Sequence, residues 1–412
     1  MKFGGTSVAD AELIRAAARR AIRAQKAGNR VAMVVSAMGA TTDRLVDLAA
    51  QITPNPPKRE MDQLLATGEQ VTISLMAMAL EQMGAAAISF TAGQIGIVTN
   101  DAHMKAKVKS IDVRRIRQHL DAGRIVVIAG FQGMTETGAV TTLGRGGSNV
   151  TLVAIAAALG AEACENYTDV DGIFTADPRI VPNARKIHRI SYDEMLELAS
   201  LGAKVLHNRS VEFAKKYNVP IHVRSSKHNR KGTMIVAETE SMERIVVSGV
   251  ALKDNLARVT LRDVPDRPGV AAAVFHQIAA HKIVVDDIIQ TIADNRQATI
   301  SFTIELADLA DAKKVVEGIG RDLGCAATFE DRLAKVSVVG MGMRMHTGVA
   351  ERMFAALAKA RINIQNITTS EIKVSCLIDR TDGQRALRLV HDAFNLGAKP
   401  RGKTKRKKSK KR

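Results

Sequence analysis

The stretch RIVVIAGFQGMTETGAVTTLGRGGSNVTLVAIAAALGAEACENYTDV, residues 124–170, decides the fold class. Residues 124–131 form a short apolar run typical of a buried strand. Residues 149–160 form a longer apolar segment that ends at a glycine, as helices often do, and residues 163–170 indicate a second strand. A strand, a helix and a strand of these lengths predict a right-handed crossover unit in a parallel sheet.

The same alternation extends over roughly the first 235 residues. Further strands are predicted at residues 30–38, 85–90 and 219–226, and further helices at 11–28, 69–84 and 113–123. Helices between such strands cover both faces of the sheet. The first half of the chain is therefore predicted to be a three-layer α/β sandwich with a mainly parallel sheet.

The C-terminal part contains an internal repeat. Two segments, beginning at Ala257 and Ala334, match at a constant offset of 79 residues. Each predicts a strand, a glycine turn, an amphipathic helix and a further strand, so we expect two small ferredoxin-like βαββαβ domains. The matched pairs are Gly269 with Gly348, Phe275 with Phe354, Ile278 with Leu357, Ile283 with Ile362, Val285 with Ile364, and Ile288 with Ile367.

Composition excludes several classes of protein. The 412 residues, 46% apolar and 25% charged, are typical of a globular chain with two or three domains. No apolar run reaches the ~18 residues needed to span a membrane, and the N-terminus has no signal-peptide pattern. We expect a cytoplasmic protein. The three cysteines lack metal-ligand spacing and are expected to act as small buried hydrophobic residues.

Much of the net charge of +18 lies at the C-terminus. Ten basic residues and no acidic one occupy residues 399–412, which leaves +8 for the rest of the chain. A block of this density is most often a solvated, disordered tail. Nonspecific contact with RNA or another polyanion is the alternative, because such binding needs only charge.

Two glycine clusters are candidates for a phosphate site. KFGGTSV, residues 2–8, is not a P-loop, but adjacent glycines let backbone N–H groups approach phosphate oxygens, and Lys2 offers a point charge. LGRGGSNV, residues 143–150, leads into a predicted helix whose N-terminus favours an anion, and Arg145 can hold a carboxylate through two parallel hydrogen bonds. Taken alone, each cluster could equally be a glycine turn.

Other polar residues are predicted at the ends of strands and helices. YTDVDGIFTADPR, residues 167–179, follows a predicted strand, where nucleotide loops lie in open α/β sheets, although its aspartates could form plain turns. Thr41, Thr42 and Glu69 are likewise predicted to lie at the ends of strands or helices. Glu69 could also be only a carboxylate in the first turn of a helix.

Taken in order, these segments resemble those of the aspartate kinases, within the amino-acid-kinase fold. The motifs are KFGGTSV, SAMG-TTD, TGEQ, AGFQG, TTLGRGGS, TDVDGIFTADPR, LGAKVLH and VRSS, and the two repeats resemble the paired ACT domains of that family. The resemblance covers residues 2 to about 396. It implies a kinase domain at residues 1–236, ACT domains at 237–328 and 329–397, and a basic tail at 398–412.

The resemblance implies transfer of the γ-phosphoryl group of MgATP to the β-carboxylate of L-aspartate, the first step of lysine, threonine and methionine biosynthesis. Glu69 would pair with the substrate ammonium and Arg145 with a carboxylate, and no protein residue is assigned as a metal ligand. The implied catalytic residues are Lys2, Arg145 and Asn149, and the implied aspartate-binding residues are Thr41, Thr42, Glu69, Arg145 and Ser148. The implied ATP-binding residues are Lys2, Phe3, Gly4, Gly5, Thr168, Asp169, Phe174, Thr175, Ala176, Asp177, Pro178, Arg179 and Lys204.

Regulation is implied as well. ACT pairs in this family bind lysine, threonine or both as inhibitors, and they pair between chains, so a homodimer or larger assembly is expected. The matching effector residues are Asp266, Gly269, Ala271 and Gln290 in the first repeat, with Asn363, Ile364 and Thr369 facing them from the second.

The sequence departs from the family pattern in two places. Asn149 stands where the family motif GRGGSD has an aspartate. The nucleophile is a carboxylate with a pKa of about 3.9, so no general base is needed, but loss of one charge from the site is expected to slow the reaction by about 10² to 10³-fold. Only Met1 precedes Lys2, where family members have an apolar strand. We expect a missing core strand and a poorly anchored Lys2, from a misassigned start codon or a truncated chain.

Two other functions stay open at this point. A catalytically weak protein that senses lysine or threonine through its ACT pair fits Asn149 and the short N-terminus. The intact set of Lys2, Glu69, Arg145 and Asp169 favours an active kinase instead. A nucleic-acid-binding function rests on the basic tail alone.

Overall fold

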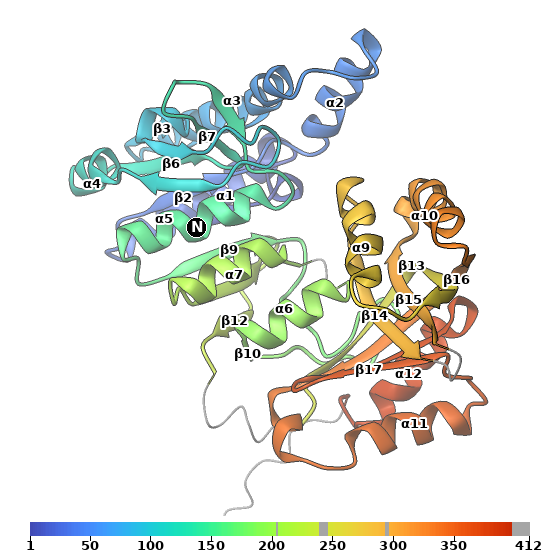
Figure 1. Ribbon diagram of the computed structural model, residues 1–412. Coiled ribbons are helices and arrows are strands. Elements are labelled where there is room, and N and C mark those ends of the chain that lie inside the picture. Colours follow the sequence, from blue (N-terminus) through green and yellow to red (C-terminus); the bar gives the residue numbers. More distant parts are fainter. Residues whose placement is uncertain (203–204, 239–245, 293–295, 398–412) are drawn as a thin grey trace, which may run out of the picture. The chain divides into compact units, whose positions relative to one another are not determined.

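Figure 1 shows a computed structural model of the chain, in which residues 1–202, 205–238, 246–292 and 296–397 are described. The chain forms two compact units. The first contains Met1–Ile173 and Lys186–Met242, and the second contains Phe174–Arg185 and Glu243–Arg412.

The first unit is built on an eight-stranded sheet in the order β10-β12-β11-β9-β1-β2-β6-β3. Neighbouring strands run parallel except β11 and β12, which are antiparallel. The predicted mainly parallel sheet is confirmed. The strands are β1 (Lys2–Phe3), β2 (Ala32–Val35), β3 (Ala87–Phe90), β6 (Ile125–Ala129), β9 (Cys164–Thr168), β10 (Arg189–Ser191), β11 (Ile221–Ser225) and β12 (Thr233–Val236).

Helices pack on both faces of this sheet (Figure 1). The helices of this unit are α1 (Ala11–Lys26), α2 (Thr41–Ile52), α3 (Lys58–Gln82), α4 (Arg114–Asp121), α5 (Gly147–Leu159), α6 (Tyr192–Ser200) and α7 (Asn208–Lys216), of which α2 packs against α3 and has no buried residue. Successive side chains of a strand point to opposite faces. Met33 and Val35 of β2 therefore pack with α1 and α3, whereas Val34 packs with Ile116 of α4 and Ile155 of α5. The predicted three-layer sandwich is confirmed.

A small second sheet in this unit was not predicted. Its order is β5-β4-β7-β8, with β4 (Ile97–Thr99), β5 (Val108–Ile111), β7 (Gln132–Met134) and β8 (Val140–Thr142). Strands this short carry too few residues to show a period-two pattern. Helix α3 also begins at Lys58 rather than at residue 69, because polar residues in its first turns hide the apolar periodicity.

The second unit contains one six-stranded antiparallel sheet in the order β14-β15-β13-β16-β18-β17. Two long strands run through both repeats: residues 249–253 of β13 pair with 335–339 of β16, and further along 258–262 pair with 326–330. The two predicted ferredoxin-like domains are confirmed, and they share these strands. The elements are β13 (Gly249–Pro265), α9 (Val270–Ala280), β14 (Val285–Ile292), β15 (Gln297–Glu305), α10 (Leu309–Leu323), β16 (Ala326–Val339), α11 (Val349–Lys359), β17 (Asn366–Ser370), β18 (Lys373–Asp379) and α12 (Gly383–Ala393).

Residues 174–185 belong to the core of the second unit. Ala176 and Val181 pack in the apolar cluster that holds α11, α12 and β18. The Thr175 hydroxyl lies 3.0 Å from His391 Nε2 and accepts the Arg185 N–H at 2.9 Å. This segment is therefore held by the repeats, although in sequence it interrupts the first unit. Across the described ranges, no helix has the length and apolarity to span a membrane.

Candidate functional site

The predicted residues of the first unit gather where its parallel strands end. Gly4 and Gly5 follow β1, Thr41 and Thr42 open α2 shortly after β2, and Asp169 follows β9. Strand β1 lies between β2 and β9, so the three strand ends are neighbours. This edge of an open α/β sheet is where ligands bind.

Gly5 stands at a close approach of two loops. A Cβ there would lie 2.8 Å from the Ala37 carbonyl oxygen and 3.1 Å from that of Gly39. The Gly39 N–H donates to the Gly5 carbonyl oxygen at 3.0 Å. Only glycine fits, and its absence of a side chain brings the backbone after β1 against the backbone after β2.

Lys2 is anchored between two strands. Its backbone pairs with Val34 of β2 and Asn166 of β9, and its side chain is only 8% exposed. The ammonium lies against Gly4, where a Cβ would be 3.2 Å from Nζ. Burial lowers the pKa of Lys2 to about 8, and the charge of Asp169 acts in the opposite direction. The expectation of a poorly anchored Lys2 is wrong, because Lys2 pairs with both neighbouring strands. The expected strand is present, but it has only two residues beside the longer β2 and β9.

Glu69 is a buried carboxylate on α3, 2% exposed. Its Oε1 accepts the Ala37 N–H at 3.0 Å, which joins α3 to the loop after β2. Its Oε2 is buried and lacks a hydrogen-bond partner among the described residues. Burial raises the pKa of Glu69 to about 7. One carboxylate oxygen is therefore available to a cationic group of a ligand.

Arg145 lies in a loop shaped by glycines. Gly144 and Gly146 have φ of 75° and 72°, a left-handed conformation that favours glycine, and α5 begins at Gly147. The Arg145 side chain is exposed, and within the described part of the chain its guanidinium has no hydrogen-bond partner. It is free to hold an anion above the N-terminus of α5.

Ser148 and Asn149 stand in the first turn of α5. Ser148 is buried against the end of β6, since a Cβ on Gly130 would lie 2.7 Å from its Oγ. Asn149 Oδ1 is buried and unpaired, counting only described residues. Both of these polar groups were predicted as site residues, and both are carried by α5, which packs against β1 and β2.

The remaining ATP-site predictions divide between the units. Thr168 Oγ1 donates to the exposed carboxylate of Asp169 at 3.1 Å in the first unit. Residues 174–179 belong to the second unit, where Asp177 and Arg179 form an ion pair of 2.6 Å. Lys204 lies outside the described residues.

The predicted effector residues of the first repeat share one pocket. Asp266, Gly269, Ala271 and Gln290 all line a cavity of about 380 Å³ between the start of α9 and the strands β14 and β15. Gly269 has a φ of 93° where α9 begins, and Gly348 has 85° at the equivalent place before α11.

The effector residues predicted in the second repeat do not line that pocket. Asn363 and Ile364 precede β17 and Thr369 lies on it. Strand β17 is one edge of the six-stranded sheet, and β14, which carries Gln290, is the opposite edge. The two groups are therefore not brought together within one chain.

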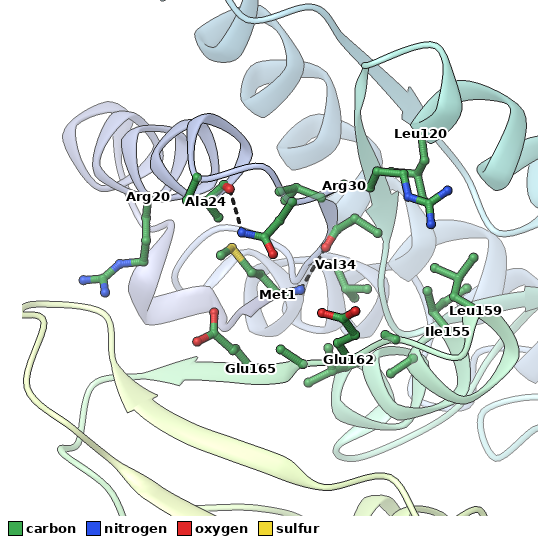
Figure 2. A pocket seen from close by; sticks show the side chains of 18 of the residues that line it. Met1, Arg20, Ala24, Arg30, Val34, Leu120, Ile155, Leu159, Glu162 and Glu165 are labelled. Atoms are coloured by element: carbon green, nitrogen blue, oxygen red, sulfur yellow. Dashed lines mark hydrogen bonds between the residues drawn. The ribbon is translucent and has the colours of Figure 1, made fainter.

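The first unit also contains a larger cavity of about 830 Å³ (Figure 2). It lies at the opposite ends of β1, β2 and β9 from the predicted kinase-site residues. Met1 lies in it, and its ammonium donates to the Ala32 carbonyl oxygen at 2.8 Å. Strands β2 and β9 both extend beyond the two residues of β1 with which they pair. The cavity is thus in line with β1, between its two neighbours.

Sequence reasoning missed two charged side chains beside the Arg145 loop. Asp62 is fully buried on α3, and Arg209 on α7 donates to backbone carbonyl oxygens of the loop region. Asp62 lies seven residues before Glu69, two helical turns away on the same face. That spacing is the signal that could have revealed it.

Comparison with known families matches residues 1–225 to the amino acid kinase family, and residues 259–320 and 336–394 to ACT domains. The aspartokinase of Geobacillus stearothermophilus is 50% identical over 395 residues, which cover 96% of each chain. The aspartate kinase of Pseudomonas putida is 49% identical, over 97% of this chain and 98% of the relative. This chain belongs to the aspartate kinases of the amino acid kinase family.

Solved structures of aspartate kinases agree with this assignment. Aspartokinase III of E. coli, in complex with aspartate and ADP, has a TM-score of 0.80 at 26% identity, covering 95% of this chain and 98% of that one. The same enzyme in complex with lysine and aspartate has a TM-score of 0.76 at the same identity, with 95% and 98% coverage. This chain is accordingly a phosphotransferase with a tandem ACT module.

Proposed function

We propose that the chain transfers the γ-phosphoryl group of MgATP to the β-carboxylate of L-aspartate. The observation that carries this proposal is the Glu69 carboxylate on α3. It is buried, and among the described residues its Oε2 has no hydrogen-bond partner. A relative, the E. coli enzyme, binds aspartate and ADP. Glu69 and Arg145 carry opposite charges, which suit the ammonium group and a carboxylate group of an amino acid.

The substrate is held at its charged groups. Glu69 Oε2 accepts a hydrogen bond from the ammonium of aspartate, and Arg145 donates to a carboxylate. The hydroxyls of Thr42 and Ser148 supply further donors. The Thr41 hydroxyl donates to the Met38 carbonyl oxygen at 2.6 Å, so it reaches the substrate as a donor only by leaving that acceptor. Aspartate enters with its β-carboxylate ionised, so the site has only to place this nucleophile in line with the phosphoryl group.

The nucleotide is held at the ends of β1 and β9. Backbone N–H groups of Gly4 and Gly5 approach its phosphates, and the Lys2 ammonium stabilises charge on the transferring group. The exposed Asp169 at the end of β9 would supply a carboxylate to Mg²⁺ that accompanies ATP, and the ion would neutralise phosphate charge. The family resemblance also assigns residues 174–179 and Lys204 to the nucleotide. Residues 174–179 belong to the second unit and Lys204 lies outside the described residues, so these assignments rest on the resemblance alone.

Asn149 makes this a slow kinase. Its buried, unpaired Oδ1 still offers an acceptor, but the amide contributes no negative charge to orient Lys2 or Mg²⁺. Loss of one preorganised electrostatic group costs about 10² to 10³-fold in rate.

The ACT module binds lysine or threonine as an inhibitor. The pocket at Asp266, Gly269, Ala271 and Gln290 supports this role, and one relative is in complex with lysine. Asn363, Ile364 and Thr369 lie at the other edge of the same sheet. They complete such a pocket only from a second chain, which favours a homodimer or larger assembly in the pathway to lysine, threonine and methionine.

The test is release of ADP from MgATP with and without L-aspartate. Aspartate-dependent release, with 4-phospho-L-aspartate trapped by hydroxylamine, supports the proposal. A folded chain that binds ATP but releases no more ADP with aspartate than without it contradicts the proposal. A thermal shift with lysine or threonine would then favour a purely regulatory function.

A further inference from the structure

We propose that Asp62 and Arg209 are positioning residues that hold the Arg145 loop, residues 143–147, at a fixed distance from Glu69. They would thereby set the spacing between the groups that hold the ammonium and the carboxylate of the substrate. The inference rests on the proposed function of Glu69 and Arg145. Neither Asp62 nor Arg209 touches the substrate in this scheme.

Asp62 ties α3 to the segment on which the loop rests. It is 0% exposed. Its carboxylate accepts hydrogen bonds from the Thr142 hydroxyl at 2.5 Å and from the Met104 N–H at 3.0 and 3.1 Å. His103 Nδ1 lies 2.7 Å from its second oxygen. Thr142 is the last residue of β8, so Asp62 fixes the strand end from which the Arg145 loop departs.

The Met104 contact reaches the loop itself. Met104 has a φ of 68°, which is uncommon for a residue other than glycine and needs support from its surroundings. The carbonyl oxygen of Met104 would lie 2.8 Å from a Cβ on Gly144. By fixing the Met104 N–H, Asp62 therefore fixes the surface against which the backbone before Arg145 packs.

Arg209 holds the loop from α7. Its two terminal nitrogens donate to the carbonyl oxygens of Leu143 and Ala106 at 2.5 and 2.6 Å. Leu143 is the first residue of the loop, and the Ala106 N–H donates in turn to the Thr142 carbonyl oxygen at 3.0 Å. The planar fork of a guanidinium suits two separate acceptors. Asp62 and Arg209 thus act on adjoining residues, Thr142 and Leu143.

One rigid element links this support to the substrate. Asp62 and Glu69 lie on α3, seven residues or about 10.5 Å apart along the axis. Helix α3 therefore carries the proposed ammonium ligand at one place and the fixing point of the Arg145 loop at another. A shift of about 1 Å in a positioning element can cost about 10²-fold in rate, so this link has a measurable consequence.

Two variants test the inference. Asp62→Asn replaces one of two accepting carboxylate oxygens with an amide donor. Arg209→Ala removes the hydrogen bonds to the carbonyl oxygens of Leu143 and Ala106. Each should raise the KM for L-aspartate at least about tenfold and leave the KM for ATP within about twofold. Arg209→Lys, which can still donate to one carbonyl oxygen, should fall between Arg209→Ala and the parent chain.

Arg117→Ala is the matched control. Arg117 also donates to two backbone carbonyl oxygens, those of Ala158 and Leu159, at 3.4 and 3.2 Å. These lie at the C-terminal end of α5, about 18 Å from its start beside the Arg145 loop. This variant should leave the KM for L-aspartate unchanged.

The outcomes separate this inference from the proposed function. Calorimetric titration of each protein with L-aspartate, in the presence of MgADP, measures binding without turnover. If the parent chain neither binds nor phosphorylates aspartate, the proposed function fails. If it does both, and folded Arg209→Ala and Asp62→Asn keep the parental KM, or raise both KM values equally, the positioning inference is overturned. If neither variant folds, an Arg209→Lys protein with an unchanged KM overturns it as well.

Discussion

The buried carboxylate of Glu69 predicts a pH dependence that an ordinary glutamate cannot give. With a pKa of about 7 in the ligand-free protein, about a tenth of Glu69 is ionised at pH 6 and about nine-tenths at pH 8. Only the ionised form pairs with the ammonium of aspartate. The profile of kcat/KM reports ionisations of the free enzyme. It should therefore rise about tenfold from pH 6 to pH 8.

The assay is initial ADP release at saturating MgATP with limiting aspartate, from pH 5.5 to 8. Glu69→Gln keeps an acceptor for the Ala37 N–H but loses the charge. Its kcat/KM should fall about 30- to 5,000-fold at pH 8, which corresponds to a loss of about 2–5 kcal/mol in transition-state binding. Its profile should be flat below pH 7. Glu81→Gln is the control. Glu81 lies on the same helix as Glu69 and accepts the Ala87 N–H, but its side chain is exposed.

A wild-type profile that stays level between pH 6 and pH 8 would refute the reasoning. So would a Glu69→Gln profile with the same slope as the parent chain, because the titrating group would then lie elsewhere.

Three further changes have expected outcomes. Asn149→Asp should raise kcat by about 10² to 10³-fold in the same ADP-release assay, and an unchanged or lower kcat would contradict the charge argument. The kcat/KM for ATP should decline above about pH 8 as Lys2 loses its proton, and this alkaline limb should disappear in Lys2→Met, whose residual rate is low. Extending the chain before Met1 by four apolar residues, Val-Ile-Val-Leu, should add pairs to β2 and β9 and raise Tm by several degrees in calorimetry, whereas Gly-Ser-Gly-Ser should not.

The architecture was largely predictable, because it depends on patterns that are local in sequence. The apolar runs of β2, β6 and β9 and the helical segments between them lie where the alternation placed them. The constant offset of the repeat revealed two similar domains. It could not reveal that β13 and β16 are shared between them, because pairing between strands this far apart in the sequence, such as Gly249 with Val339 and Arg262 with Ala326, leaves no local signal.

The candidate site was predictable in its ligands but not in its supports. Lys2, Glu69 and Arg145 belong to glycine-rich motifs with a recognisable chemistry. Asp62 and Arg209 act through carbonyl oxygens and a hydroxyl far away in the sequence, and no motif marks such contacts. The burial that shifts the pKa of Lys2 and Glu69 likewise depends on packing that only the fold creates.

Burial shifts the pKa values of both Glu69 and Lys2, and in each case it disfavours the charged form. A carboxyl group whose pKa is raised by folding stabilises the fold at low pH and loses that contribution as the pH rises through about 7. A lysine whose pKa is lowered to about 8 destabilises the fold fully below that pH, and this cost declines only as the pH rises from about 8 toward the ordinary pKa of 10.5. Near neutral pH the ligand-free protein therefore bears both costs, about 3 kcal/mol each.

Each substrate supplies the charge that one of these groups lacks. The ammonium of aspartate stabilises ionised Glu69, and the phosphates of ATP stabilise protonated Lys2. Binding should return both pKa values toward their ordinary ranges, so the pH profile of kcat should be broader on both sides than that of kcat/KM. The free-energy cost of burying these two charges is thus reduced when both substrates are bound.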